Sequence, residues 1–335
     1  MKAIFIIGGG ISGLVTGIAL RQHGIAVTVV EAGFYPRHKV CGEFLNGAGI
    51  DLLEALEIPL RKFAASVETI SFHRGEKSSQ TSALPNAGVA IPRFSFDKLL
   101  ALNFEVLGGK LKCGTRYRAH STPEGYVQAT GRRLRRPAKW KWYGVKAHAR
   151  NVRQKADLEL HLVENGYIGL CRLDAHRSNI CGLFRRPVAN SERSADLLEH
   201  FTRPNSLRDR LAGAEWVEES IATVSGLPVP ESDPPESFSV GDAFGMIPPF
   251  TGNGMSIAIE LGMLGAGILK QYAEGNLSWG EAAEGYHRAG EELVRKRMFA
   301  ANLSQKLLLS PICQRLFMAT ADRTNVWGRV FEATR

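Results

Sequence analysis

The chain lacks the cysteine patterns of disulfide-rich and zinc-binding proteins. Its 335 residues include only five cysteines, an odd number, and no pair spaced as Cys-x-x-Cys. The nine histidines form no His-Glu-x-x-His and no other paired metal spacing. These absences argue against a disulfide framework and against a metal site. They favour a reducing compartment, so we expect a cytoplasmic protein without a metal.

Hydrophobic runs long enough to cross a membrane are also missing. The most apolar stretch, Ala3 to Leu20, is interrupted by five glycines, a serine and a threonine, and a strand pattern follows it at once. It has no small-residue cleavage site, so we expect neither a membrane helix nor a signal peptide. With 44% hydrophobic and 22% charged residues, the chain is predicted to be a soluble, folded protein. Its length indicates about two domains.

Acidic residues are fewer than basic ones. The chain has 33 Asp and Glu against 42 Lys and Arg, a formal net charge of +9. Part of this surplus is concentrated in one segment, whose basic residues are Arg132, Arg133, Arg135, Arg136, Lys139, Lys141, Lys146, Arg150 and Arg153. The segment can be a solvated sheet face, or it can attract nucleotide phosphate, an acidic acyl carrier protein or an anionic membrane surface. No nucleic-acid-binding motif accompanies the charge, so nucleic acid is not an expected partner.

The first thirty residues carry the clearest structural pattern. Ala3–Ile7 is a continuous apolar run suited to a buried strand, and Gly8–Gly13 is a turn. Leu14–His23 then has the pattern of a helix, and Ala26–Val30 is a second strand. This is a βαβ unit, which implies a parallel sheet and a right-handed crossover.

The turn matches the dinucleotide-binding pattern G-x-G-x-x-G. Gly8 permits the tight turn, Gly10 lets the helix N-terminus approach a pyrophosphate, and Gly13 allows close packing of helix on strand. Glu31, at the end of the second strand, can accept hydrogen bonds from a ribose diol. Because a carboxylate repels a 2′-phosphate, this site is predicted to hold FAD or NAD rather than NADP.

A second glycine-rich segment follows a short predicted strand, Phe238–Val240. Gly241 and Asp242 end this strand, which places Asp242 where it can hold a chain of hydroxyl groups. Gly252–Gly254 then put bare backbone amides at the start of an apolar helix, Met255–Lys270. A helix N-terminus stabilises negative charge, which suits a flavin ring as it is reduced.

Four short blocks together resemble the FAD-dependent oxidoreductases of the aromatic hydroxylase (monooxygenase) and geranylgeranyl reductase superfamily. The blocks are Gly8-x-Gly10-x-x-Gly13 with Glu31, Pro36-Arg37-x-Lys39-x-Cys41-Gly42, Arg93-x-x-Phe96-Asp97, and Gly241-Asp242-Ala243 with Pro249-x-x-Gly252-x-Gly254. The resemblance spans roughly residues 1 to 275. It implies an α/β fold: a Rossmann-type FAD-binding domain with an inserted antiparallel-sheet substrate domain and C-terminal helices.

This resemblance leads to a division of the chain. The expected FAD-binding domain comprises residues 1–62, 91–131 and 236–275, the substrate-binding sheet domain comprises 63–90 and 132–235, and 276–335 form a C-terminal helical segment. Runs with strand character inside the sheet domain are Val67–Phe72, Trp140–Ala149, Leu158–Val163, Tyr167–Leu173 and Asn179–Phe184. A helix over Ser191–Leu211 and a proline-rich linker over Pro228–Pro235 are expected to follow.

The resemblance also implies which residues contact the cofactor. Glu31 binds the adenosine ribose, Arg37 and Arg93 lie near the cofactor, and Asp242 binds the ribityl chain or the pyrophosphate. The expected set of cofactor-binding residues is Gly8, Gly10, Ile11, Ser12, Gly13, Glu31, Arg37, Gly42, Arg93, Gly241, Asp242, Pro249, Gly252, Asn253, Gly254 and Met255.

Other side chains are candidates for chemistry and substrate contact. The resemblance places Cys41 near the flavin ring face as the candidate catalytic residue, and the basic residues before it can lower its pKa toward thiolate. A buried structural thiol is the alternative. His38 can transfer protons near neutral pH or be an ordinary surface residue. Trp142, His148 and Tyr167 are candidate substrate contacts, with plain sheet packing as the alternative.

Three functions remain open. The leading hypothesis is a flavin monooxygenase that hydroxylates an aromatic or lipophilic small metabolite with NAD(P)H and O2. The second is a flavin-dependent reductase or dehydrogenase of a polyprenyl or polyketide-like chain, and the third a non-catalytic flavin-binding protein. The third is raised because Ala129-Thr130-Gly131-Arg132 stands where the family usually has Asp-Gly.

Two further sequence features concern how the electron donor binds and whether the protein is a halogenase. No second glycine pattern exists for NAD(P)H, so this donor is expected to bind transiently. Trp140-Lys141-Trp142 is similar to the Trp-x-Trp of flavin halogenases, but Ile-Pro does not follow it, and halogenation is not expected. Substrate identity, the choice of NADH or NADPH, and oligomeric state stay open.

Overall fold

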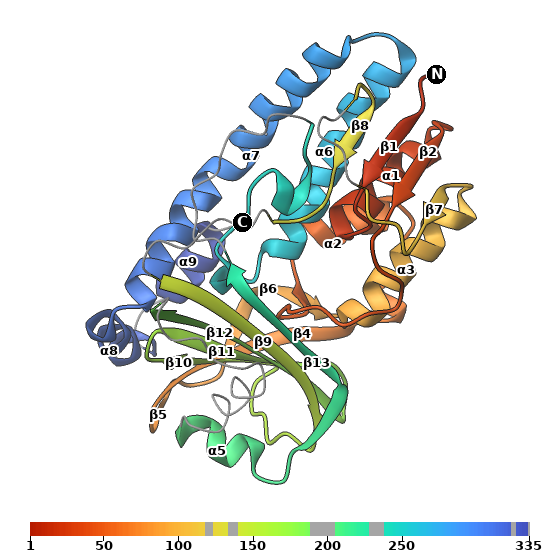
Figure 1. Cartoon of the computed structure of the whole chain (residues 1–335). Helices are drawn as coiled ribbons and strands as arrows, with labels where there is room; N and C mark the ends of the chain where they lie inside the picture. Colours follow the sequence, from red (N-terminus) through yellow and green to blue (C-terminus); the bar gives the residue numbers. More distant parts are fainter. Residues whose placement is uncertain (118–122, 133–139, 188–204, 228–237, 323–325, 334–335) are drawn as a thin grey trace.

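Two β-sheets at opposite ends of the molecule, bridged by helices, make up the fold (Figure 1). The computed structural model describes residues 1–117, 123–132, 140–187, 205–227, 238–322 and 326–333. Within these residues the architecture is α/β, with a parallel Rossmann sheet, a larger curled sheet and C-terminal helices, which confirms the predicted fold class.

The smaller sheet has four parallel strands built around the N-terminal strand. Its order is β7 (Lys110–Lys112), β2 (Val27–Val30), β1 (Ile4–Ile7) and β8 (Tyr126–Gln128). The predicted βαβ unit is therefore confirmed. The strand predicted over Phe238–Val240 is reduced to a single parallel bridge, in which Ser239 pairs with Gln128, the last residue of β8.

Helix α1 (Ile11–Gln22) lies between this sheet and helix α6 (Gly254–Glu274). Its residues from Ile11 to Leu20 are all buried, because it packs on the sheet on one side and on α6 on the other. Thr16 Oγ1 donates to the backbone oxygen of Gly262 at 3.0 Å. Two other helices cover this domain, α2 (Ala48–Ala55) and α3 (Arg93–Val106). Helix α3 begins at Arg93, directly after Pro92.

The larger sheet is assembled from separate segments of the chain. Its order is β13 (Glu215–Leu227), β9 (Trp140–Arg150), β12 (Arg177–Pro187), β11 (Gly166–Arg172), β10 (Leu158–Val163), β4 (Ala65–Arg74), β6 (Ser82–Ala90) and β3 (Phe44–Leu45), with β5 (Lys77–Ser78) paired to β4. The sheet is antiparallel except where β4 and β10 run parallel, with Ile70 opposite Leu158. These two strands come from segments on either side of α3, so no hairpin sets their direction. The expected domain bounds remain a prediction.

Two long strands of this sheet, and the two-residue strands β3 and β5, were not predicted from the sequence. Strand β6 contains Pro85 and Gly88, which are poor strand formers. Strand β13 has a register shift between Val217 and Ala222, which breaks the alternation that would have marked it. The helix predicted over Ser191–Leu211 is described only as α5 (Asn205–Leu211), and the linker predicted over Pro228–Pro235 lies outside the described residues.

The C-terminal helices connect the two ends of the molecule. Helix α7 (Trp279–Leu308) starts at a capping box formed by Ser278 and Glu281 and packs along α6. Helices α8 (Pro311–Thr320) and α9 (Val326–Ala333) contact β4 and β6 of the larger sheet. The predicted helical C-terminus is thus confirmed. No helix among the described residues is both long and apolar enough to span a membrane.

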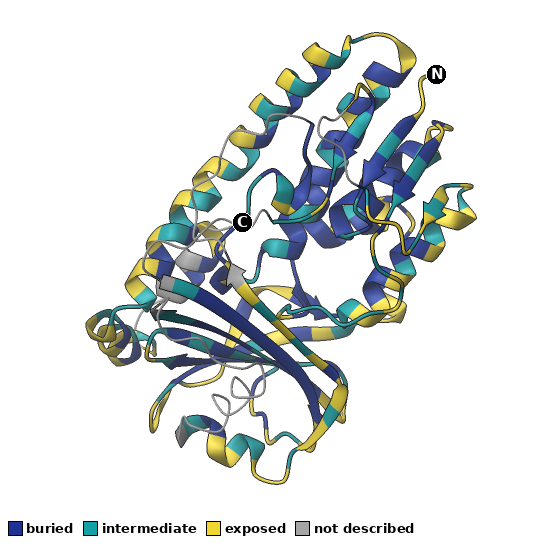
Figure 2. Cartoon of the chain, viewed as in Figure 1, coloured by how far each residue is buried: buried dark blue, intermediate teal, exposed yellow. Residues whose placement is uncertain are grey.

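Buried side chains form three groups that follow these layers (Figure 2). The largest surrounds α1 and includes Leu14, Ile18 and Phe104. A second lies between the larger sheet and the C-terminal helices, and a third lies between the opposite face of that sheet and α5. The larger sheet is therefore covered on both faces.

The contact between α1 and α6 depends on the absence of a side chain at Gly262. A Cβ there would lie 2.9 Å from the backbone oxygen of Ser12, so Gly262→Ala should lower the free energy of unfolding by about 1–3 kcal/mol. Gly267, on the same helix, has no atom within 4 Å of the position that a Cβ would take, so Gly267→Ala should raise it by about 0.5–1 kcal/mol. Urea unfolding of both variants checks this, and equal effects would contradict the packing argument.

Candidate functional site

A cavity of about 790 Å³ lies between the two sheets. This volume is within the range of small-molecule and cofactor sites. Residues from the glycine turn after β1, the segment 37–44, the start of α6 and the inner face of the larger sheet line it. Its apolar wall on the larger sheet includes Ile70, Leu158, Leu160, Tyr167, Leu183 and Val224.

The glycine turn forms one end of the cavity. Gly8 has φ +111°, and a Cβ there would lie 2.2 Å from the oxygen of Ala129. A Cβ on Gly13 would lie 2.1 Å from the oxygen of Gly8, so both residues must be glycine for the backbone to pack. Gly10 is different, because nothing lies within 4 Å of its Cβ position. The hydroxyl of Ser12 is buried there and has no hydrogen-bond partner within the described part of the chain, so this end is shaped for a polar or anionic group.

Glu31 is tied to the same turn. Its carboxylate accepts hydrogen bonds from the backbone N–H groups of Gly9 and Gly33, each at 2.8 Å, and pairs with Arg37 at 2.9 Å. Burial raises the pKa of Glu31, but the hydrogen bond from Gly33 and the charge of Arg37 outweigh it and hold the pKa below its ordinary value. Glu31 is therefore ionised at neutral pH. Tyr35 donates its hydroxyl hydrogen to the oxygen of Gly9 and helps to fix the turn.

The second glycine-rich segment forms the other end of the cavity. Gly252 has φ +68°, and Gly254, the first residue of α6, has nothing within 4 Å of a Cβ position. Asp242 is exposed toward the cavity, and burial of the surrounding region raises its pKa despite the charges of Arg93 and Arg132. Bare backbone amides thus open α6 at the cavity wall, as the sequence predicted.

Residues 37–43 form the loop between these two ends, and ion pairs hold it in place. Besides the Arg37 pair, Lys39 contacts Asp97 of α3 at 2.8 Å. Asp97 is fully buried and also binds Arg93 through both carboxylate oxygens, at 2.7 and 2.9 Å. Burial raises the pKa of Asp97, but the charges of Arg93 and Lys39 lower it below its ordinary value.

The structure corrects two expectations about this loop. Cys41 lines the cavity, but burial raises the pKa of its thiol although Arg93 opposes the shift, so the expected drop toward thiolate is wrong. His38 does not titrate near neutral pH, because burial and the charge of Lys146 lower its pKa to about 4. The missing signal in both cases was burial, which adjacent residues in the sequence do not reveal.

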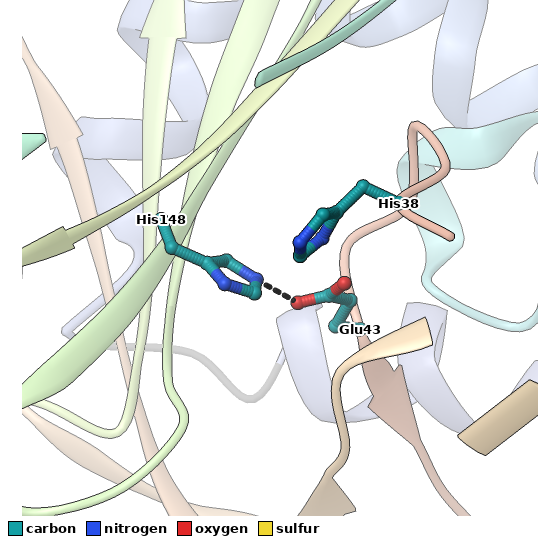
Figure 3. A group of neighbouring side chains, drawn as sticks. All are labelled: His38, Glu43 and His148. Atoms are coloured by element: carbon teal, nitrogen blue, oxygen red, sulfur yellow. Dashed lines mark hydrogen bonds and ion pairs between the residues drawn. The ribbon is translucent and has the colours of Figure 1, made fainter. Parts of the chain in front are cut away.

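Glu43, at the end of the loop, is the centre of a buried charged cluster (Figure 3). Its side chain is fully buried and lies 3.1 Å from the ammonium of Lys146 and 2.7 Å from Nε2 of His148. The ammonium of Lys146 also lies 3.0 Å from Nδ1 of His38. Burial raises the pKa of Glu43, but His148 and Lys146 lower it below its ordinary value, so the carboxylate is ionised.

A similar cluster lies within the larger sheet. His73, Glu159 and His161 bring their polar atoms together, and Arg210 of α5 contacts Glu159 at 2.9 Å. Burial raises the pKa of Glu159, yet hydrogen bonds from His161, Lys155 and Arg210 lower it to about 2. This cluster already contains a cation, Arg210. None of its residues is among the described residues that line the cavity.

Most of the predicted cofactor-binding residues meet at the cavity. The lining includes Gly8, Gly10, Ile11, Ser12, Glu31, Arg37, Gly42, Arg93, Asp242, Pro249, Gly252, Gly254 and Met255. Gly13, Gly241 and Asn253 are buried and are not among the lining residues. A Cβ on Gly241 would lie 2.7 Å from Cβ of Ser12, so this glycine allows the second segment to pack on α1.

The three candidate substrate contacts are placed differently. Tyr167 lines the cavity. His148 is buried and contacts the lining residues Glu43 and His38, and Trp142, also buried, is not among the described lining residues. Residues 142, 146 and 148 share one face of β9, so alternation alone could not tell which of them touches the cavity.

The sequence analysis missed Glu43 and the role of Lys146. Lys146 belongs to the basic segment of the sequence, for which a solvated sheet face is one interpretation. Its side chain is nevertheless fully buried. Arg150 and Arg153 are exposed, whereas residues 133, 135, 136 and 139 lie outside the described residues. A lysine and a histidine two residues apart in an otherwise apolar strand were the available signal for a buried polar cluster.

The remaining wall of the cavity comes from the C-terminus. Phe331 of α9, predicted only as part of a helical segment, lines the cavity together with Phe250. No motif in the sequence links this helix to the site, so only the fold could reveal it.

Comparisons with known proteins agree with this architecture. Residues 6–36 match the family model of the NAD(P)-binding Rossmann-like domain. A comparison with curated protein sequences gave no match. Many solved structures do match: the flavin-dependent brominase Bmp2 has a TM-score of 0.76 at 15% identity, with 99% of this chain and 92% of that chain covered.

Two other similar structures have different names and the same architecture. A geranylgeranyl bacteriochlorophyll reductase-like protein of Thermoplasma acidophilum has a TM-score of 0.76 at 17% identity, over 99% of this chain and 95% of that chain. PqsL of Pseudomonas aeruginosa, named a "probable FAD-dependent monooxygenase", has a TM-score of 0.66 at 17% identity, over 99% and 98%. The chain therefore has the fold of the FAD-dependent monooxygenase, halogenase and geranylgeranyl reductase-like flavoproteins. At these identities the similarity establishes the fold alone.

Replacing Asp97 should expose how strongly the loop depends on its ion pairs. Asp97→Asn leaves Arg93 and Lys39 without their buried carboxylate and should lower the free energy of unfolding at pH 7 by about 3–5 kcal/mol. Since the folded-state pKa lies below the ordinary 3.8, the contribution is complete above about pH 4 and is lost as pH falls through the folded value.

Denaturant unfolding between pH 3 and pH 7 measures the difference in unfolding free energy between the wild type and Asp97→Asn. This difference should become smaller toward pH 3. Asp51→Asn, at an exposed position on α2, is the matched control and should change stability by less than about 0.5 kcal/mol. A penalty that stays constant with pH would show that the carboxylate charge is not what stabilises the loop.

Proposed function

We propose that the protein is an FAD-dependent oxidoreductase, and most specifically a flavin monooxygenase that hydroxylates an aromatic or lipophilic small metabolite with NAD(P)H and O2. The observation that carries the proposal is that one cavity joins the two glycine-rich segments, which lie about 240 residues apart in the sequence. Each segment opens a helix, so an elongated ligand can be held at both ends.

The shape and polarity of the cavity fit FAD. Gly10 and the partnerless hydroxyl of Ser12 would hold the pyrophosphate at the start of α1. Asp242 would accept hydrogen bonds from the ribityl hydroxyls, and Gly254 at the start of α6 would lie against the flavin ring. When bound, FAD supplies the hydride and oxygen chemistry, as in other flavoproteins.

The protein's own contribution would be orientation and exclusion of water. The larger sheet presents apolar side chains to the cavity, among them Leu160, Leu183 and Val224. Such a wall favours an aromatic or lipophilic substrate over a highly charged one. The raised thiol pKa makes Cys41 a neutral group at the cavity wall at pH 7, able to contact a ligand without acting as a thiolate.

A reductase of a polyprenyl or polyketide-like chain is the second candidate function. The same apolar wall accommodates a long hydrocarbon, and the geranylgeranyl reductase-like structure covers nearly the whole chain. A non-catalytic flavin-binding role is the third, because Thr130, Gly131 and Arg132 line the cavity without the acid of the usual Asp-Gly motif. Halogenation stays outside the proposal because the Trp-x-Trp-Ile-Pro pattern is incomplete.

Filling the space at Gly10 tests where the cofactor lies. Gly10 has φ −78° and ψ −179°, which valine adopts without strain, so Gly10→Val should fold normally. Its side chain would project into the proposed pyrophosphate site, and loss of one or two hydrogen bonds to a charged group should weaken FAD binding by about tenfold to a hundredfold.

Equilibrium dialysis against FAD and thermal melting of the same samples separate binding from folding. Gly280→Val is the control, because its Cβ position is also open but is exposed on α7 away from the cavity. Unchanged FAD affinity in Gly10→Val would place the cofactor elsewhere.

Oxygen dependence distinguishes the candidate functions. A monooxygenase should consume O2 together with NAD(P)H, and at least tenfold faster once an aromatic or lipophilic substrate is added. Parallel measurements with an oxygen electrode and by anaerobic stopped flow check this. Anaerobic reduction of a substrate double bond would favour the reductase, and no flavin reduction by NADH or NADPH with any candidate ligand would favour the non-catalytic role.

A further inference from the structure

The cluster around Glu43 contains a lysine that can only donate hydrogen bonds. The ammonium of Lys146 is fully buried and lies 3.1 Å from Glu43 Oε1 and 3.0 Å from Nδ1 of His38. Lys146 is ion-paired with Glu43, and an ammonium has no acceptor. Nδ1 of His38 must therefore be the acceptor, and the ring proton of the neutral imidazole must be on Nε2.

A metal ion is the competing explanation of this cluster. Nitrogen atoms of His38 and His148 and a carboxylate oxygen of Glu43 lie within 4.8 Å of one another, a set that could ligate a metal (Figure 3). The ammonium of Lys146 contacts two of these three side chains, so it already supplies the positive charge that a metal would bring. The cluster is better explained as a hydrogen-bonded assembly of one anion and one cation.

The position of the His38 ring is held from several sides. Its ring stacks on Phe94 with centroids 4.6 Å apart and meets the edge of His148 at 5.2 Å. His38 lines the cavity, and its Nε2 has no hydrogen-bond partner among the described residues. Its Nδ1 side is thus committed to Lys146, while the opposite nitrogen is free for a ligand.

We propose that Lys146 fixes His38 as the neutral Nε2–H tautomer, and that this N–H is a specificity-determining donor for a carbonyl or phenolate oxygen of the substrate. The substrate half of this inference rests on the proposed function, whereas the tautomer half does not. In these roles Lys146 is a positioning residue and His38 a binding residue.

The charges around His38 support a neutral ring. Burial, Lys146 and His148 lower its pKa, Glu43 and Glu219 raise it, and the result is about 4. Between pH 5 and pH 8 the ring therefore donates a hydrogen bond without giving up a proton. A ligand that covers this N–H without offering an acceptor leaves it unpaired, so a ligand that offers an oxygen there is preferred over one that does not.

Nitrogen-15 NMR of histidine-labelled, FAD-loaded protein tests the tautomer directly. His38, assigned from the signals lost in His38→Gln, should show a protonated Nε2 and an unprotonated Nδ1 from pH 5 to pH 8. In Lys146→Met the donor is lost, so the two tautomers should mix and the titration should move to higher pH. A protonated Nδ1 in the wild type, or an unchanged spectrum in Lys146→Met, would overturn the assignment.

The test can still be carried out if Lys146→Met does not fold. Lys146→Met leaves Glu43 without its cation, so the double variant Glu43→Gln with Lys146→Met, which removes both charges together, provides the same comparison. The wild-type spectrum also distinguishes the two tautomers, and it needs only His38→Gln, for the assignment of its signals.

Binding of 4-nitrophenol tests the substrate half. Equilibrium dialysis at pH 7 with FAD-loaded protein should show that His38→Leu binds this probe about three- to tenfold more weakly than wild type, the value of one hydrogen bond. His38→Gln should retain most of the affinity, because its amide can accept from Lys146 and donate to the probe. Equal affinity in His38→Leu, or no binding by the wild type, would overturn the donor role.

The same samples separate this inference from the proposed function. Flavin absorbance and reduction by NAD(P)H, measured on the wild-type protein, report on the flavoprotein function. If flavin is absent from the wild type, the proposed function fails, and the tautomer is then measured on the protein without FAD. If flavin is bound and reduced but the probe does not distinguish the variants, only the substrate contact fails.

Discussion

A single loop, residues 37–43, is held by ion pairs to three separate elements, and the shape of the cavity depends on it. Arg37 pairs with Glu31 after β2, Lys39 with Asp97 of α3, and Glu43 with Lys146 of β9. Glu31 and Asp97 belong to the domain of the smaller sheet and Lys146 to the larger sheet, so the loop fixes one domain against the other. Because Asp97, Glu43 and Lys146 are fully buried, none of these charges can be solvated if its partner moves.

This loop has two tasks, which are to hold its ion pairs and to line the cavity. Residues 37, 39 and 43 point to their ionic partners, and the backbone oxygen of Cys41 accepts a hydrogen bond from Asn179 of β12 at 2.9 Å. All seven residues of the loop also line the cavity, so the anchored segment is itself part of the wall that a ligand would contact. A loop without regular secondary structure is thereby made rigid enough to position small groups.

Much of the fold could be predicted because its signals are local. The βαβ unit is encoded by an apolar strand, Gly8, Gly13 and the acid at Glu31, all within about thirty residues. Long-range features were not accessible in the same way. The burial that raises the pKa of Cys41 and lowers that of His38 comes from strands more than a hundred residues away, and the bulge in β13 hides its own alternation.

The wall formed by Phe331 has a consequence for the order of events during synthesis. Strand β1 and the glycine turn leave the ribosome long before α9, yet the cavity that they line is also lined by a side chain more than three hundred residues later. Any ligand that needs this wall can be fully enclosed only after α9 has emerged and docked against the larger sheet. Until then this part of the wall is missing from the cleft.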